Sequence, residues 1–367
     1  MKINTKGVVG RLAVVAAAFL AEPSYSATEI WWTGEGTNNK WSNQDNWFDK
    51  KTSEKRTPMD DDVLVFQGGV GNYTVLSNDI SSLSVTKMSI QDGASFTIEG
   101  ESLALVGNPA IESVSQGGFV CNLPLELKNT TAFSLKYPGT VFDAPIDIDG
   151  TSVLTLKFSD TAEKYVEFNG DITGPYAEIC AASMLSGLSK THGWPVFNGK
   201  VKVDRVSHGN IIYTGAKFMV AGNEASVVET GLADVLFGVA GAAPSNAVLS
   251  FKAGNYLESS WGRSRFFVTG DQTIDRLESQ QPIYGDKIIA NTYFIRSSDA
   301  ALPCVLTMKG SASCENWMYV GDTISLVWDP NGNHRTVFHD RDHTTLGSIT
   351  VKGGVFEMAG TCRFASV

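Results

Sequence analysis

Short stretches of alternating apolar and polar residues, broken by glycine or by Asn-Asp turns, follow one another through most of the sequence. Examples are "DVLVFQGG", "YTVLSND" and "SFTIEG" in the first third, and "ISLVWDPNGN", "GSITVKGG" and "VFEMAG" near the end. Alternation with a period of two is typical of β-strands that bury one face. The recurring unit of strand, glycine, strand and glycine is about 20 residues long. No other feature constrains the fold as strongly.

Strands this short and numerous can form stacked sandwiches, a propeller or a solenoid. A repeat of about 20 residues favours the β-solenoid, in which coils stack about 4.8 Å apart and inward side chains form apolar ladders. A sandwich more typically has longer strands separated by about 8 to 12 residues. We therefore predict an all-β fold with solenoid repeats over residues 59–367, and an array of β-sandwiches is the alternative. The segment Ala177–Ser189 is expected to be a short helix or a loop.

The first 27 residues have the three parts of a secretory signal. An apolar core, "LAVVAAAFLA", lies between a positively charged start and small residues that permit cleavage after Ser26 or Ala27. The positive charges of this segment are Lys2, Lys6 and Arg11. No later stretch has the length of a transmembrane helix. We expect the mature chain to begin near Thr28 and to be extracellular or attached to the cell surface.

Charge and cysteine content exclude some classes of function. The formal net charge of −10 disfavours nucleic-acid binding, which needs a basic face. The five cysteines are an odd number and too few for a disulfide scaffold, and most of them are expected to be small buried side chains. Cys304 and Cys314 are near enough in sequence to pair across two neighbouring strands.

Residues 28–58 contain four of the eight tryptophans, immediately before the first regular strand. The end of a solenoid exposes an apolar layer and unpaired strand edges, which promote aggregation unless they are capped. Large aromatic rings cover such a layer well, so this segment is predicted to be an N-terminal cap. Exposed aromatic rings also stack on sugars, which is the alternative function for these residues. The four tryptophans are Trp31, Trp32, Trp41 and Trp47.

The segment "WWTGEGTNNKWSNQDNWFD…RTPMDDDVLVF" resembles the start of secreted bacterial proteins built from autotransporter-associated β-strand repeats. The segment "GSITVKGGVFEMAGTCRF" resembles the repeat itself, and the likeness covers roughly residues 28–107 and 320–367. The resemblance implies a single-stranded right-handed β-helix from a Gram-negative-type bacterium. It also implies a passenger-like segment, without the translocator barrel of autotransporters, that ends inside a repeat as a fragment or a short relative would.

Three groups of polar residues could carry chemistry. "FHDRDH" places His339, Arg341 and His343 on one face of a strand, but a cation between two histidines disfavours a metal site. Asp147 and Asp149 lie on one strand face at a separation that glycoside hydrolysis can use. Ile146 and Ile148 occupy the other face, so the two aspartates are expected to be ordinary outward positions.

The third group is Asp60, Asp61 and Asp62. Oxygen-rich clusters suit Ca²⁺, so these aspartates are a weak candidate site for that cation, although the EF-hand and nonapeptide calcium motifs are absent. The alternative is that one of them forms a turn or cap before the first strand. No other cofactor is expected.

These observations favour an exported, non-enzymatic β-solenoid that acts as a structural or adhesin-like passenger or stalk of the cell surface. The alternative is a polysaccharide-binding or polysaccharide-degrading β-helix, either a lyase or a hydrolase, whose partner is a cell-surface or extracellular polysaccharide. The usual sequence motifs of nucleophilic, metal-dependent and nucleotide-binding enzymes are absent.

Overall fold

The computed structural model describes residues 27–158 except 70, 72, 92, 116–117 and 137–138, and then residues 165–183. From residue 194 onward it describes the strands and short turns beside them, up to Phe364. The expected signal segment lies outside the described residues, apart from its last position. Every described element except one 3₁₀ helix, η1 (Gln44–Asn46), is a β-strand. The prediction of an all-β chain is confirmed.

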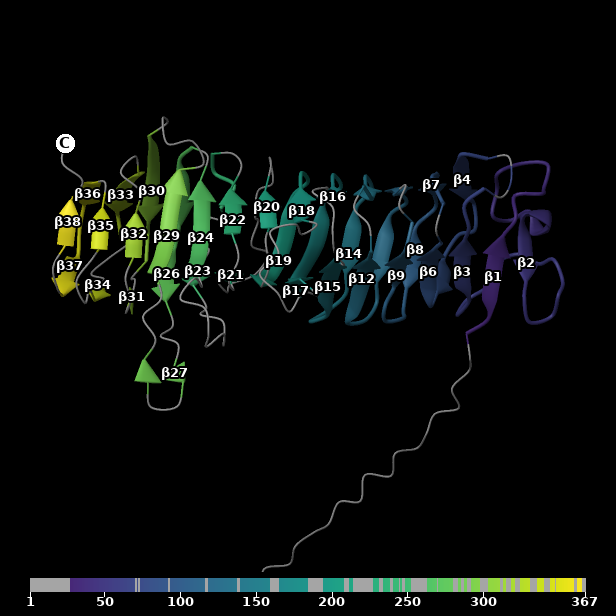
Figure 1. Cartoon of the computed structure of the whole chain (residues 1–367), viewed down its shortest axis with the longest axis horizontal. Helices are drawn as coiled ribbons and strands as arrows, with labels where there is room; N and C mark the ends of the chain where they lie inside the picture. The colour runs from purple at the N-terminus through teal and green to yellow at the C-terminus, as the bar shows by residue number, and fades with distance from the viewer. Residues whose placement is uncertain are drawn as a thin grey trace, which may run out of the picture.

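The strands form three ladders that run the length of an elongated molecule (Figure 1). We name each ladder after its first strand within the regular coils. The β3 face begins with β1 (Glu29–Trp32) and continues with β3 (Val63–Phe66), β6 (Lys87–Ile90), β9 (Ile111–Ser113), β12 (Thr131–Leu135), β15 (Val153–Phe158), β17 (Ile172–Ser183), β19 (Val201–Ser207), β21 (Val227–Thr230), β23 (Val248–Phe251), β26 (Arg276–Ser279), β31 (Ser313–Cys314), β34 (Arg335–His339) and β37 (Val355–Ala359).

The β4 face is a 13-stranded parallel sheet. It consists of β4 (Val75–Asn78), β7 (Thr97–Gly100), β10 (Val120–Asn122), β13 (Val141–Phe142), β16 (Tyr165–Phe168), β18 (Trp194–Phe197), β20 (Ile211–Tyr213), β22 (Asp234–Phe237), β24 (Arg263–Val268), β29 (Thr292–Ser297), β32 (Met318–Val320), β35 (Thr344–Leu346) and β38 (Cys362–Phe364).

The β5 face lies between these two in chain order. It begins with β5 (Leu83–Val85), β8 (Leu103–Leu105), β11 (Leu125–Leu127) and β14 (Ile146–Ile148). The first parts of β17 and β19 extend this face. Both strands are long enough to continue from the β5 face onto the β3 face, where their second parts pair with the neighbouring coils. At the same place in later coils lies a four-stranded sheet of β25 (Gln272–Ile274), β30 (Cys304–Met308), β33 (Ile324–Trp328) and β36 (Ser348–Val351).

Each coil pairs in parallel with the next coil along the chain. Val63 pairs with Lys87, 24 positions later, and Ile111 pairs with Phe133, 22 positions later. This spacing agrees with the repeat that the sequence predicts. Parallel pairing of consecutive coils on three faces is the architecture of a β-solenoid, so that prediction is confirmed and the array of sandwiches is not observed. The right-handed winding stays a prediction.

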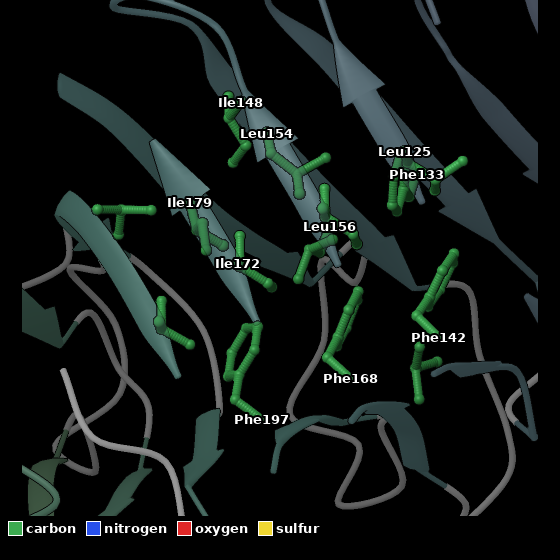
Figure 2. Close-up of a cluster of buried hydrophobic side chains, with 14 of the residues drawn as sticks. Leu125, Phe133, Phe142, Ile148, Leu154, Leu156, Phe168, Ile172, Ile179 and Phe197 are labelled. Atoms are coloured by element: carbon green, nitrogen blue, oxygen red, sulfur yellow. The ribbon is translucent and has the colours of Figure 1, made fainter. Parts of the chain in front are cut away.

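The core is made of inward side chains stacked from coil to coil. One ladder on the β5 face runs through equivalent register positions in six successive coils, all of them buried: Leu83, Leu103, Leu125, Ile146, Ile172 and Val201. On the β4 face, the rings of Phe142, Phe168 and Phe197 stack with centroids 4.9 and 5.1 Å apart (Figure 2). Burial of each such side chain stabilises the fold by about 1.5–3 kcal/mol.

The corner between the β4 and β5 faces is polar and tightly packed. Gly100 has φ of +120°, and a Cβ there would lie 2.1 Å from the carbonyl oxygen of Asn78, so only glycine fits. Further along the same corner, the Asn198 amide donates to Asn169, and the Asn169 amide donates to Asp143, both at 2.7 Å. Hydrogen bonds between side chains thus continue the stacking outside the apolar core.

The expectation of a helix or a loop at Ala177–Ser189 is wrong for its described part. Residues up to Ser183 belong to β17, which pairs with β15 and β19. Ala177 and Ile179 are buried while Glu178 is only half-buried, which is the alternation of a strand. The rest of that segment lies outside the described residues.

One coil carries an insertion. A short antiparallel hairpin of β27 (Ile283–Tyr284) and β28 (Lys287–Ile288) projects from the row of coils below β26 (Figure 1). Glu278 consequently pairs with Ser313, 35 positions later.

Candidate functional site

The tryptophans before the first coil form one buried aromatic cluster. Trp41 and Trp47 are fully buried and Trp32 is 3% exposed. Trp47 meets Trp32 and Trp41 edge-to-face, with ring centroids 5.0 and 5.6 Å apart. Trp41 and Trp47 also contact Phe66 of the first regular coil at 5.8 and 5.7 Å. Since these three rings are buried, they offer no face on which a sugar could stack.

Trp31 differs from the other three because it lies on the outer surface of β1. Its indole N–H donates to a Glu29 carboxylate oxygen at 3.2 Å, and the Lys50 ammonium lies 3.3 Å from the ring centroid. A cation over an indole face is a favourable contact. A ligand that stacked on this face would have to displace Lys50. Trp31 is therefore the only one of the four predicted residues that is arranged for contact with another molecule.

The same segment closes the first strand edges of two faces. On the β3 face, β2 (Trp47–Asp49) pairs antiparallel with β1, so the parallel ladder ends in an antiparallel strand. On the β4 face, the backbone N–H of Trp41 donates to the Ser77 carbonyl, and the Ser77 N–H donates to the Asn39 carbonyl, both at 2.9 Å. These bonds use backbone groups of β1 and β4 that would otherwise be free to pair with another chain.

Asp60, Asp61 and Asp62 close the edge of the third face. The backbone N–H of Asp61 donates to the Ser84 carbonyl at 2.8 Å, and the Asp60 carboxylate accepts from the Ser84 N–H at 2.9 Å. The Asp62 carbonyl accepts from the N–H of Thr86 at 2.8 Å. The three aspartates thus pair with β5 much as a preceding strand would.

A buried ion-pair cluster joins these pieces of the cap. Arg56 donates to both carboxylate oxygens of Asp62, at 2.6 and 2.8 Å, and through Nε to Asp49 at 2.7 Å. The two carboxylates are about 95% buried. Burial pushes the pKa of Asp49 upward, but hydrogen bonds from Arg56 and from the N–H groups of Thr52 and Lys51 outweigh it, so the pKa is lowered. The hydrogen bond to Asp62 is the largest cause that raises the pKa of Arg56.

These partners define what the aspartates do in the structure. Asp60 and Asp62 use their carboxylates for the strand edge and for Arg56. Over the described ranges, no three Asp, Glu, His or Cys side chains lie close enough to hold a metal ion. Through the bonds described above, the carboxylates of Asp60 and Asp62 and the backbone of Asp61 help to close the cap.

The two carboxylates considered for glycoside hydrolysis are exposed on the β5 face. Ile146 and Ile148 are buried, and Asp147 accepts a hydrogen bond from the Thr173 hydroxyl at 2.8 Å. The neighbouring Lys128 has a raised pKa, chiefly because of its hydrogen bond to Glu126, and with smaller effects from Asp149 and Asp147. This is a solvated row of charges along parallel strands, which agrees with the outward placement expected from the sequence.

The remaining predicted residues are only partly described. His339 ends β34, whereas Arg341 and His343 lie outside the described residues. Cys304 and Cys314 lie on β30 and β31, which belong to two different sheets, so the expectation that they sit on neighbouring strands is wrong. The sulfur of Cys304 accepts the N–H of Gly270 at 3.3 Å. In the described part of the chain there is no helix long and apolar enough to span a membrane.

Sequence reasoning did not foresee the role of Arg56 or the hydrogen bonds of Asn46, although Asn46 lies in the segment that resembles the start of proteins with autotransporter-associated repeats. Arg56 gave no signal of its own, because a single basic residue in a polar loop is usually solvated. Asn46 is fully buried; its amide donates to the carbonyls of Asn38 and Lys40, at 2.8 and 2.9 Å, and its oxygen accepts from Gly36. The Asn-Trp pair at 46–47 was the signal that could have identified it, because a buried amide beside a buried ring commonly holds a loop together.

Comparison with known proteins adds no identification: no family model, curated protein or solved structure matches the chain.

Proposed function

We propose that the chain is an exported, non-enzymatic β-solenoid that serves as a structural or adhesin-like module of the bacterial cell surface. The observation that carries this proposal is the dedicated closure of the N-terminal end on all three faces, followed by a long regular stack of coils (Figure 1). Such an arrangement gives length and resistance to aggregation.

The outer surface supports the same proposal. The polar side chains at the corner of the β4 and β5 faces bond to their equivalents in the next coil, as Asp143, Asn169 and Asn198 do. Side chains engaged in this way reinforce the stack and do not converge on a substrate. The resemblance of residues 28–107 and 320–367 to autotransporter-associated repeats, together with the signal-like first 27 residues, is the basis for proposing export from a Gram-negative-type bacterium.

Two measurements on the protein expressed with its own N-terminus in a Gram-negative host test the proposal. Mass spectrometry of the mature N-terminus is expected to give cleavage after Ser26 or Ala27. External protease added to intact cells is expected to degrade the protein or to release it, whereas a version lacking residues 1–27 stays protected inside. An uncleaved chain retained in the cytoplasm would contradict the proposal.

A second candidate function is polysaccharide binding, which the outward position of Trp31 favours. A glycan array probed with residues 28–367, with and without Ca²⁺, distinguishes the two. Binding to one polysaccharide class that Trp31→Ala weakens, and that Phe48→Leu on the paired strand leaves unchanged, would support the second candidate. No binding by a folded, β-rich protein would leave the structural module as the function.

A further inference from the structure

The position of Trp31 is not explained by the closure of the cap. The other three tryptophans cover the apolar layer of the first coil, whereas Trp31 is half-buried on the outer side of β1. In the next five coils, the outward position in register with Trp31 holds residues that are not aromatic: Val65, Ser89, Glu112, Ser134 and Lys157. The indole is therefore not one step of an outer stacking ladder.

Two side chains of opposite charge flank this indole. Glu29 Oε2 accepts the indole N–H at 3.2 Å, and the Lys50 ammonium lies 3.3 Å from the ring centroid. The backbone N–H of Lys50 donates to the Glu29 carbonyl at 3.4 Å, so the two residues lie side by side on paired strands. Both are exposed, and within the described residues neither forms an ion pair. Lys87, further along the same edge, is already paired with Glu112 at 2.9 Å.

The position of Lys50 shows which kind of group the indole face attracts. The face of an aromatic ring carries negative partial charge, so it attracts an ammonium group and also the slightly positive C–H groups of a sugar ring. An exposed cation–π contact is weak, and the lysine stem is flexible. Lys50 can therefore leave the face and donate to a hydroxyl of the sugar that replaces it, while the second carboxylate oxygen of Glu29 accepts from another hydroxyl.

The two charges determine which sugar fits this site. One ammonium and one carboxylate leave the site without net charge, so a uronate would gain an attraction to Lys50 and a comparable repulsion from Glu29. A neutral sugar uses the donor and the acceptor without that repulsion. Stacking on Trp31 also requires a flat ring face of C–H groups, which a pyranose with equatorial hydroxyls presents.

We propose that Trp31, Lys50 and Glu29 bind a neutral polysaccharide whose pyranose units carry equatorial hydroxyls. This inference rests on polysaccharide binding, the second candidate function, and names the class of sugar. The indole provides the stacking face, and the two charged side chains fix the orientation of the sugar through its hydroxyls.

The test is titration calorimetry on residues 28–367 with two hexasaccharides of the same β-1,4 linkage: cellohexaose and its counterpart oxidised to glucuronate at every C6. Wild type is expected to bind cellohexaose about tenfold more tightly than the glucuronate form. Trp31→Ala is expected to weaken the binding of cellohexaose about tenfold, with a circular dichroism spectrum and thermal midpoint close to those of wild type. Phe48→Leu, on the paired strand, is the matched control and is expected to bind like wild type.

A second variant separates the binding site from a structural role of Trp31. In Glu29→Gln, the glutamine oxygen still accepts the indole N–H, but the site gains a net positive charge. The preference is therefore expected to move about tenfold toward the glucuronate form. A structural role alone would not change which of the two sugars binds better.

The possible failures point to different conclusions. If the folded chain binds nothing on the glycan array, polysaccharide binding is removed as a function, and this proposal with it. If the chain binds a glycan but not cellohexaose, or prefers the glucuronate form, only the proposed class of sugar is overturned. Cellohexaose binding that Trp31→Ala leaves unchanged, or a preference that Glu29→Gln leaves unchanged, also overturns the proposal, because other groups then bind the sugar.

Discussion

The cap argument makes its sharpest prediction at Trp47. This ring contacts Trp32, Trp41 and Phe66, and its indole N–H donates to the Trp41 carbonyl at 3.0 Å in a fully buried position. Trp47→Ala removes all of these contacts and leaves a buried carbonyl without its donor. Truncation of a buried tryptophan costs about 3–5 kcal/mol, and the loop around the cap has little means of collapsing into the space.

The lost free energy should promote unfolding of the cap alone before it promotes unfolding of the whole solenoid. Coils of a solenoid interact only with their neighbours, so destabilisation of the cap mainly increases its own opening. A loss of about 3 kcal/mol raises the fraction of open cap by roughly a hundredfold, since each 1.4 kcal/mol is a factor of ten. An open cap exposes the edges of β1, β4 and β5 and the ring of Phe66.

The assays are urea unfolding followed by circular dichroism, and size-exclusion chromatography over a range of concentrations. Trp47→Ala is expected to lower the unfolding midpoint and to form assemblies larger than those of wild type. Trp31→Ala, which changes the same residue type on the outer surface, is expected to cost less than about 1 kcal/mol and to elute like wild type. An unchanged midpoint and elution profile for Trp47→Ala would show that the aromatic cluster does not cap the solenoid.

Three further predictions concern buried titratable groups. Arg56→Ala leaves the carboxylates of Asp49 and Asp62 buried without their cation, and urea unfolding is expected to show a loss of about 3 kcal/mol in the free energy of unfolding. This value is at the low end of the range for a broken buried ion pair because the Arg56 side chain is 22% exposed. Since the pKa of Asp49 is lowered in the fold, its contribution is complete above the ordinary carboxyl pKa of 3.8 and is lost as pH falls through the lowered value. The thermal midpoint of wild type should therefore fall in acid more steeply than that of Asp49→Asn, and parallel curves would contradict this. Burial raises the pKa of Cys121 to about 12, so the native protein should leave this thiol unmodified by a maleimide at pH 8, and rapid labelling there would refute its burial.

The fold followed from the sequence because its signal is repeated many times. Alternating segments such as Leu103–Leu105 and Ile146–Ile148 are weak predictors singly. Their regular return, with glycine between many of them, excludes most alternative folds. Ala177–Ser183 was misjudged because its run of small residues hides the alternation that pairing with β15 and β19 makes clear. The segment is a strand because it pairs with coils that are distant in sequence, and local sequence patterns do not encode such pairing.

The candidate site was less predictable, and the reason is geometric. The position of the tryptophans suggested a cap, but the sequence could not show that Trp31 alone faces outward. The roles of Arg56 and of Asp60–Asp62 depend on which edges the loop reaches, and that is set by tertiary contacts. Cys304 and Cys314 were expected on neighbouring strands because they are close in sequence. Their strands belong to different sheets, which the sequence distance does not show.

Because each coil contacts only its neighbours, the stack has a mechanical consequence. If the stack is pulled from the side opposite the cap, the coil nearest the applied force loses its contacts first, and each coil that peels away exposes the next. A coil of 24 residues, as between Val63 and Lys87, releases about 80 Å of extended chain. Tension would therefore be absorbed in a series of nearly equal steps that reaches the aromatic cluster around Trp47 last.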